Sequence, residues 1–366
     1  MKIPFVDLKA QYKSIQKEID AAVSAVITET AFVRGKYVST FEQEYRNAHG
    51  VDHCISCANG TDALYIALKA LDIGPGDEVI TTALSWISTS ETISQTGARV
   101  VFADIEPDFF TIDPARIEEK ITNKTKAIIP VHMYGQAADM GRIMAIADRH
   151  KLAVIEDCAQ AHFAKYDKKN VGTFGIAGTF SFYPGKNLGA YGDAGAIISN
   201  DEDFATRARM FANHGSLTKH QHEMEGINSR LDGLQAAVLS VKLRYIHAWN
   251  SQRRLVAERY DSGLRGLTNC SAPLVRDSNE HVYHLYVVRT DQRDEMQELL
   301  KQNGVATGIH YPSSLPFLKA YEYLGHRPED FPTAFEYQST ILSLPMFPEL
   351  TEEMIDYVVT LISEQQ

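Results

Sequence analysis

Short apolar runs alternate with longer amphipathic stretches along most of the chain. Apolar side chains three or four residues apart predict helices, whereas short apolar runs between turn residues predict buried strands. The helices expected from this pattern lie at 15–26, 41–48, 63–71, 88–96 and 140–150. The expected strands lie at 78–82, 99–102, 127–131, 153–156, 179–182 and 194–199. Because strands and helices alternate, the pattern predicts crossover connections and a mostly parallel sheet.

The pattern changes after about residue 250. A long helix rich in Ala, Leu and Val is expected at 231–248, and beyond it come a strand at 281–289 and helices at 293–303 and 354–364. We therefore predict a large α/β domain at 1–250, which includes the N-terminal segment, and a small α+β domain at 251–366. A chain of 366 residues is long enough for two such domains.

The amino-acid composition disfavours several classes of function. The net charge of -11 disfavours a general nucleic-acid or membrane-surface binder, which needs a basic face. We expect no membrane partner, because the sequence lacks a signal-like N-terminus and an apolar run that could span a bilayer. Four cysteines without the spacing of a disulfide framework favour the reducing cytoplasm. The Cys54–Cys57 pair stands alone in an apolar strand, so no metal site is predicted.

The segment 181–189 places one lysine, Lys186, among aromatic, proline and glycine residues. A lysine that forms an imine needs a fixed turn and enough desolvation to lose its proton near neutral pH. Upstream, the apolar run 153–156 predicts a buried strand that delivers Asp157 at its carboxyl end. A lysine for the imine and an acid for the pyridinium nitrogen are the minimal protein groups for pyridoxal phosphate.

A second motif, Asn59-Gly60-Thr61-Asp62, precedes an expected helix. Exposed N–H groups and the helix dipole at such an end suit a phosphate, although an ordinary helix cap is the favoured explanation when these residues are taken alone. Neither a Walker A motif nor a Rossmann glycine fingerprint is present, which disfavours nucleoside triphosphate and dinucleotide sites.

With these motifs in this order, the chain resembles the DegT/DnrJ/EryC1 family of nucleotide-sugar aminotransferases. The resemblance runs from Ile3-Pro4-Phe5 to the 342–346 segment and includes 156–161, 181–186 and 228–232. It implies the aspartate aminotransferase fold, that is, pyridoxal phosphate fold type I. A large domain with a mostly parallel seven-stranded sheet between helices would carry a small C-terminal α+β domain.

The resemblance also implies roles around pyridoxal phosphate and its aminated form, pyridoxamine phosphate. Lys186 would form the Schiff base and shuttle the proton, and Asp157 would keep the pyridine nitrogen protonated. The remaining cofactor contacts would come from Gln160 to the ring hydroxyl, Trp86 stacked on the ring, Gly60, Thr61 and Ser181 at the phosphate, and Asn228 at the phosphate of the neighbouring subunit's cofactor. The family more often carries Phe or Tyr at the position of Trp86, but an indole also offers a face for stacking.

The implied substrate contacts are Tyr183, Arg230, His310 and Tyr311, with Arg230 at the sugar or its diphosphate. Simpler readings stay open for several positions: Trp86 as a core residue, Ser181 as a buried strand serine, His310 as a satisfied interface histidine and Asp157 as a cap. The expected assembly is a homodimer with shared active sites.

The implied reaction moves the amino group of L-glutamate to a keto nucleotide-sugar. Segments 219–232 and 191–195 are similar to members acting on 3-keto sugars. A dTDP-3-keto-6-deoxyhexose is therefore favoured, giving a 3-amino sugar for surface polysaccharide or glycoconjugate biosynthesis. A UDP-3-keto-hexuronic acid comes second and a 4-keto sugar third. A sugar dehydratase or a non-catalytic regulatory relative is disfavoured by Lys186.

Overall fold

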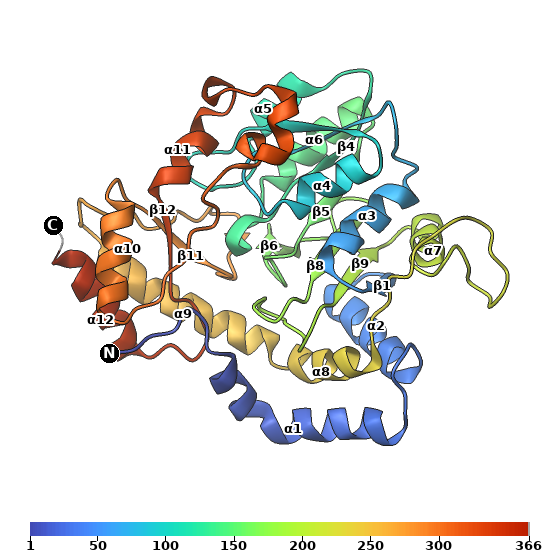
Figure 1. Ribbon diagram of the computed structural model, residues 1–366, viewed down its shortest axis with the longest axis horizontal. Helices are drawn as coiled ribbons and strands as arrows, with labels where there is room; N and C mark the ends of the chain where they lie inside the picture. Colours follow the sequence, from blue (N-terminus) through green and yellow to red (C-terminus); the bar gives the residue numbers. More distant parts are fainter. Residues whose placement is uncertain (365–366) are drawn as a thin grey trace.

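A seven-stranded sheet forms the centre of the molecule (Figure 1). The structure is a computed structural model that describes residues 1–364. The strands of the sheet, in chain order, are β1 (His53–Cys57), β2 (Glu78–Thr82), β3 (Arg99–Ala103), β4 (Thr125–Ile129), β5 (Ala153–Asp157), β8 (Ala177–Ser181) and β9 (Gly195–Ser199). Their spatial order is β1-β9-β8-β5-β4-β2-β3. All pairs from β8 to β3 are parallel, and only β9 runs antiparallel to its neighbours. The predicted mostly parallel sheet is confirmed.

Helices cover both faces of this sheet. Those of the first 264 residues are α1 (Leu8–Thr28), α2 (Lys36–His49), α3 (Gly60–Ala70), α4 (Ser88–Gln95), α5 (Pro114–Lys120), α6 (Met140–His150), α7 (Glu202–Phe211), α8 (Gly233–Leu243) and α9 (Ile246–Leu264). Alternate strand residues point to opposite faces. Ile55 and Ile197 accordingly join a core with α3 and α7, whereas Cys54 and Ile198 join one with α2 and α8. The sheet therefore separates two hydrophobic cores.

The C-terminal part is built on β11 (Tyr286–Arg289) and β12 (Ile341–Leu344), which pair antiparallel. The other elements there and in the loops are α10 (Arg293–Gln302), α11 (Pro332–Thr340), α12 (Glu352–Ser363), the short strands β6 (Lys165–Tyr166), β7 (Lys169–Asn170) and β10 (Asn279–Glu280), and the 3-10 turns η1 (Met133–Gly135), η2 (Leu315–Phe317), η3 (Lys319–Leu324) and η4 (Pro328–Asp330). The N-terminal segment joins this part, because Ile3 bridges to Val305 and is buried in the C-terminal core. In residues 1–364, no helix combines the length and apolarity needed to cross a membrane.

The single helix predicted at 231–248 is wrong, because the chain forms α8 and α9 with a break between them. The Tyr245 N–H bonds to the Lys242 carbonyl, one residue short of a regular helical bond. Arg244 and Tyr245 both bond to Glu18 of α1, so tertiary contacts set the break. The predicted domain boundary at residue 250 falls inside α9. The strand expected at 281–289 is also shorter, because only 286–289 finds a partner strand.

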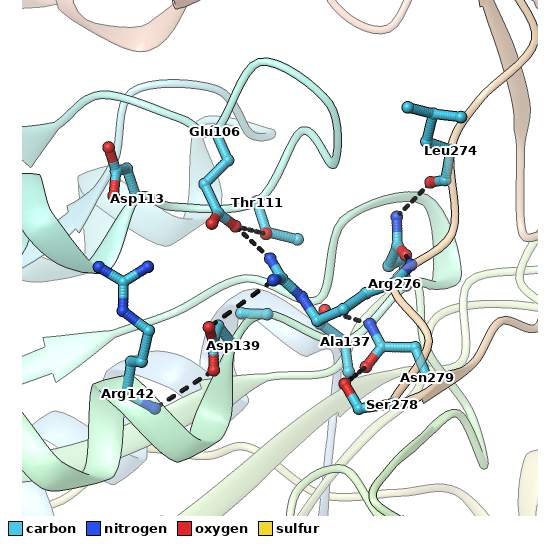
Figure 2. A network of polar contacts seen from close by, with 12 residues as sticks. Glu106, Thr111, Asp113, Ala137, Asp139, Arg142, Leu274, Arg276, Ser278 and Asn279 are labelled. Atoms are coloured by element: carbon cyan, nitrogen blue, oxygen red, sulfur yellow. Dashed lines mark hydrogen bonds and ion pairs between the residues drawn. The ribbon is translucent and has the colours of Figure 1, made fainter.

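A network of polar contacts, called the latch below, ties residues 274–279 to the loops that precede α5 and α6 (Figure 2). The Arg276 guanidinium lies 2.5 Å from the Glu106 carboxylate and 3.7 Å from that of Asp139, which caps α6. The Asn279 amide donates to the Ala137 carbonyl at 2.7 Å. Since these groups are largely buried, the latch fixes the 132–139 loop, from which Tyr134 reaches the candidate site described next.

Candidate active site

The sequence-predicted acid and lysine lie at the carboxyl ends of adjacent strands. Asp157 ends β5, Ser181 ends β8, and Lys186 lies in the loop of residues 182–190 that follows β8. Crevices outside the carboxyl ends of parallel strands are where open α/β sheets bind ligands. Strand register therefore brings together residues that are 29 positions apart in sequence, as counted from Asp157 to Lys186.

The Asp157 carboxylate is 4% exposed and is held in place by two donors. The Thr89 hydroxyl donates to one oxygen at 2.9 Å, and the Ala159 N–H donates to the other at 3.1 Å. Burial raises the pKa of Asp157, and these two hydrogen bonds and the charge of Lys186 oppose that rise. The arrangement leaves an acid that a cationic partner would stabilise as a carboxylate.

Lys186 projects from a loop that folds back on itself. Its own N–H donates to the Tyr183 carbonyl at 2.8 Å, and the Ala190 N–H donates to the Phe182 carbonyl at 2.7 Å. A Cβ at Gly189 would lie 2.4 Å from the Pro184 carbonyl oxygen, so only glycine allows this close turn. Burial lowers the pKa of the Lys186 amine to about 8, against a smaller upward effect of Asp157.

The two groups influence each other's pKa without touching. In the part of the chain that the structure describes, no direct ion pair joins Lys186 to Asp157, although each charge acts on the other. An acid and a readily deprotonated amine that face one site but stay apart leave room for a group between them. Perturbed pairs of this kind are typical of catalytic sites.

We expect the Lys186 amine of the cofactor-free protein to react with an amine reagent at unusually low pH. Only the neutral amine reacts, so a folded-state pKa of about 8 moves half-maximal reactivity to that pH. Ordinary lysines, with a pKa of about 10.4, require a much higher pH. Labelling across pH 6–11 with peptide mapping measures this, with exposed Lys301 as the reference. Parallel titration of Lys186 and Lys301 would contradict the desolvated environment of Lys186.

The start of α3 packs directly against the end of β8. Asn59 caps the helix by accepting the Asp62 N–H at 2.8 Å. A Cβ at Gly60 would lie 2.6 Å from the Ser181 Cβ, so the glycine lets the helix start approach Ser181. Thr61 and Ser88 share a hydroxyl contact at 2.7 Å. Hydroxyls and helix N–H groups therefore gather where a phosphate is expected.

A second group of polar and aromatic side chains surrounds Gln160. Its amide donates to the Tyr311 hydroxyl at 3.1 Å and accepts the Tyr134 N–H at 2.7 Å. The Trp86 ring centroid lies 5.7 Å from that of Tyr311, and the indole is 58% exposed, which disfavours its reading as a core residue. Gln160, Tyr311 and Trp86 are thus neighbours, and their roles at the cofactor and the substrate stay predictions.

His310 lies close to this region and is already engaged. Its Nδ1 lies 2.8 Å from the Ser343 hydroxyl, and its ring stacks on Phe5. Burial, and to a smaller extent the charge of Lys186, lowers the pKa of His310 to about 4. The ring is therefore neutral at pH 7. Tyr183, from the lysine loop, is exposed.

Asn228 and Arg230 flank Ser229 in the segment between α7 and α8. Asn228 is exposed, whereas Ser229 bonds to the Ala58 N–H and to Asp62 beside the start of α3. Arg230 lines a cavity of about 230 Å³ together with Arg34 and Arg209. Burial lowers the pKa of Arg34, and repulsion from the other two arginines adds to the effect. The cavity thus carries excess positive charge, which suits an anion.

Sequence reasoning missed several residues that hold the site. Thr89 anchors Asp157, and Tyr134 connects Gln160 to the His310 carbonyl. The only sequence signal for Thr89 is its place three residues after Trp86. His132 and Glu156 form a buried pair at 3.0 Å, and Glu156 also accepts the N–H groups of 172, 174 and 175. Because His132 also accepts the Ala138 N–H, this pair with nearby Cys158 is a closed hydrogen-bond network, and we assign it no metal.

The arrangement of fold and site defines a type I aminotransferase, and comparison with known proteins identifies its family. The model of the DegT/DnrJ/EryC1/StrS aminotransferase family matches residues 13–363. The chain belongs to this family, so the predicted family, fold and enzyme class are confirmed. Members of this family depend on pyridoxal phosphate.

Individual relatives cover almost the whole chain. A protein of Geobacillus stearothermophilus called "Pleiotropic regulatory protein" is 47% identical over 100% of this chain and 98% of its own length. The dTDP-3-amino-3,6-dideoxy-alpha-D-galactopyranose transaminase of Aneurinibacillus thermoaerophilus is 44% identical over 99% of both chains. S. venezuelae DesV, whose crystal structure holds a ketimine intermediate, is 40% identical in sequence to this chain. The two structures match with a TM-score of 0.97 over 100% of this chain and 98% of that one.

Proposed function

We propose that the protein transfers the amino group of L-glutamate to C3 of a dTDP-3-keto-6-deoxyhexose. The product would be a 3-amino sugar for surface polysaccharide or glycoconjugate biosynthesis. The observation that carries the proposal is the full-length similarity to a transaminase named for a dTDP-3-amino sugar. The separated Lys186 and Asp157 support the catalytic part, because a desolvated amine and a buried acid that influence each other's pKa are typical of catalytic sites.

The site fits pyridoxal phosphate. The start of α3 and Ser181 would hold the phosphate, Asp157 the ring nitrogen, Gln160 the ring hydroxyl and Trp86 the ring face. When bound, pyridoxal phosphate supplies an aldehyde that carries the amino group and a ring that stabilises negative charge on the substrate carbon.

The chain itself supplies binding and proton transfer. Lys186 Nζ, neutral in an appreciable fraction near pH 7, would take a proton from the α-carbon of the donor. In the second half of the reaction it would deliver a proton to the sugar carbon that receives the amino group. The Asp157 carboxylate, oriented by the Thr89 hydroxyl, would keep the ring nitrogen of the bound cofactor protonated. Neutral His310 and Tyr311 would approach the sugar, as would exposed Tyr183.

Arg230 and its cavity support the nucleotide part of the substrate. The chain is acidic overall, with a net charge of -11, yet Arg34, Arg209 and Arg230 gather around one cavity with Glu42 as the opposing carboxylate. A diphosphate needs such local positive charge against an acidic background.

We also propose a homodimer with shared sites. Asn228 is exposed, and so are the apolar side chains of Phe32, Val33 and Leu217 near the same segment. The apolar face of α8 does not support the dimer, because α1 and α2 of the same chain cover it. Light scattering tests the assembly, and a fully active monomer would contradict it.

We place the enzyme in the cytoplasm, because its four cysteines are free, buried thiols.

A substrate panel tests the reaction. With L-glutamate as donor, we expect turnover of a dTDP-3-keto-6-deoxyhexose to a sugar whose nitrogen lies on C3, as read by NMR. The panel includes a UDP-3-keto-hexuronic acid and a dTDP-4-keto-6-deoxyhexose, and the Lys186→Ala variant is the blank. Exclusive reaction of either alternative sugar would overturn the proposed acceptor. No amination of any sugar would favour a regulatory role, as the name of the Geobacillus relative suggests for that protein.

A further inference from the structure

Helices α8 and α9 hold the lysine loop, residues 182–190, and its continuation at three points. The Lys242 ammonium donates to the Gly189 carbonyl at 2.7 Å. The Gln235 amide oxygen accepts the Tyr191 N–H at 2.8 Å. The Asn187 amide donates to Asn250 at 2.9 Å. Of these three helix residues, only Lys242 carries a formal charge.

Lys242 is buried in an unusual way. It is 1% exposed, and in residues 1–364 it forms no ion pair with a carboxylate. Its Nζ instead lies 4.3 Å from the centroid of the Tyr191 ring, on the same strand-connecting loop as Gly189. Burial lowers its pKa to about 8, and the more distant charge of Glu349 raises it only partly. Burying an ammonium without an anion costs free energy, so its contacts with the loop must compensate.

The atom that Lys242 holds is at the base of the turn that carries Lys186. Gly189 packs against the Pro184 carbonyl, and the next residue, Ala190, closes the loop on Phe182. Both contacts enclose Lys186, because one joins residues 184 and 189 and the other joins residues 182 and 190. A charge-assisted hydrogen bond to the Gly189 carbonyl therefore restrains the backbone from which the Lys186 side chain projects.

We propose that Lys242 is a positioning residue for Lys186, acting through the Gly189 carbonyl and the Tyr191 ring. Its role is to fix the lysine loop so that the Lys186 amine is presented toward Asp157 and the substrate carbon. This inference rests on the proposed function of Lys186 as the reacting amine.

Replacing Lys242 with Met keeps the length and apolar stem of the side chain but removes the donor. We expect kcat to fall about ten- to a hundredfold while KM for the sugar and for glutamate stays within about twofold, as expected for a misplaced reactive group. In the full-length protein, amide deuterium exchange of residues 183–192 should accelerate. If Lys242→Met does not fold, Lys242→Leu, which also removes the donor, is measured by the same criteria.

The matched control is Tyr260→Phe. It also removes a buried side-chain donor from a backbone carbonyl, that of Pro345, but in the C-terminal core. A loss of kcat and faster loop exchange in Lys242→Met, but not in Tyr260→Phe at equal loss of Tm, supports the positioning role. Unchanged loop exchange, or equal effects of both variants, overturns it. Because exchange needs no turnover, this outcome is separate from a failure of the proposed function, which would appear as no amination of any sugar by the parent protein.

Discussion

Lys186→Ala is expected to reduce transamination by at least about a thousandfold, because it removes the group that moves the proton. General acid–base groups contribute about 10²–10⁴ in rate, and this lysine is also the amine that the cofactor engages in the proposed function. The backbone of the loop should persist, since the bonds of Gly189, Ala190 and Tyr191 involve other groups. The fall should therefore appear in kcat with little change in Tm.

Initial rates with glutamate and the keto sugar measure this effect, and thermal unfolding checks the fold. Lys301→Ala is the control, because Lys301 is exposed on α10 and, within residues 1–364, its ammonium pairs only with Glu298. Pyridoxal phosphate should still be retained through the start of α3, which the variant leaves intact. Turnover within tenfold of the parent protein would show that another group moves the proton.

The positions of Asp157 and Lys186 in the candidate site are predictable from the sequence, because local sequence patterns determine them. Asp157 ends an apolar run, and Lys186 lies in a glycine- and proline-containing turn, so both were placed by pattern alone. Parallel register then brought them to one edge of the sheet. The residues that hold them, Thr89 and Lys242, were not predicted, because their roles depend on distant elements meeting in space.

The break between α8 and α9 has a similar explanation. Residues 231–248 contain no proline, and their apolar pattern is continuous, so the sequence predicts one helix. The break depends on Glu18, which is more than two hundred residues away in sequence. Its carboxylate accepts hydrogen bonds from both Arg244 and Tyr245. The apolar residues of 231–248 alone are compatible with an interface between subunits, but the fold shows that α1 and α2 of the same chain cover α8. Burial patterns identify a hydrophobic face but not the element that packs on it.

Asp157→Asn is expected to lower the rate on the order of a hundredfold or more while leaving the fold intact. The charge of Asp157 would keep the ring nitrogen protonated in the proposed function, and an amide of the same size has no charge to do so. Loss of one preorganised electrostatic group typically costs about 10²–10³ in kcat.

The hydrogen bonds around Asp157 explain why this variant should fold. The Asn oxygen can still accept the Ala159 N–H, and the new amide N–H can donate to the Thr89 hydroxyl. That hydroxyl also contacts Ser85 at 2.9 Å and can reverse its direction toward it. The control is Asp201→Asn, in which a helix-capping aspartate far from the site keeps its bond to the Phe204 N–H, since Asn caps helices as well as Asp does. We expect parent-like rates and Tm for Asp201→Asn, and a parent-like Tm with a much lower kcat for Asp157→Asn. Near-normal turnover in Asp157→Asn would mean that the buried carboxylate only caps its strand, and the electrostatic role would then be abandoned.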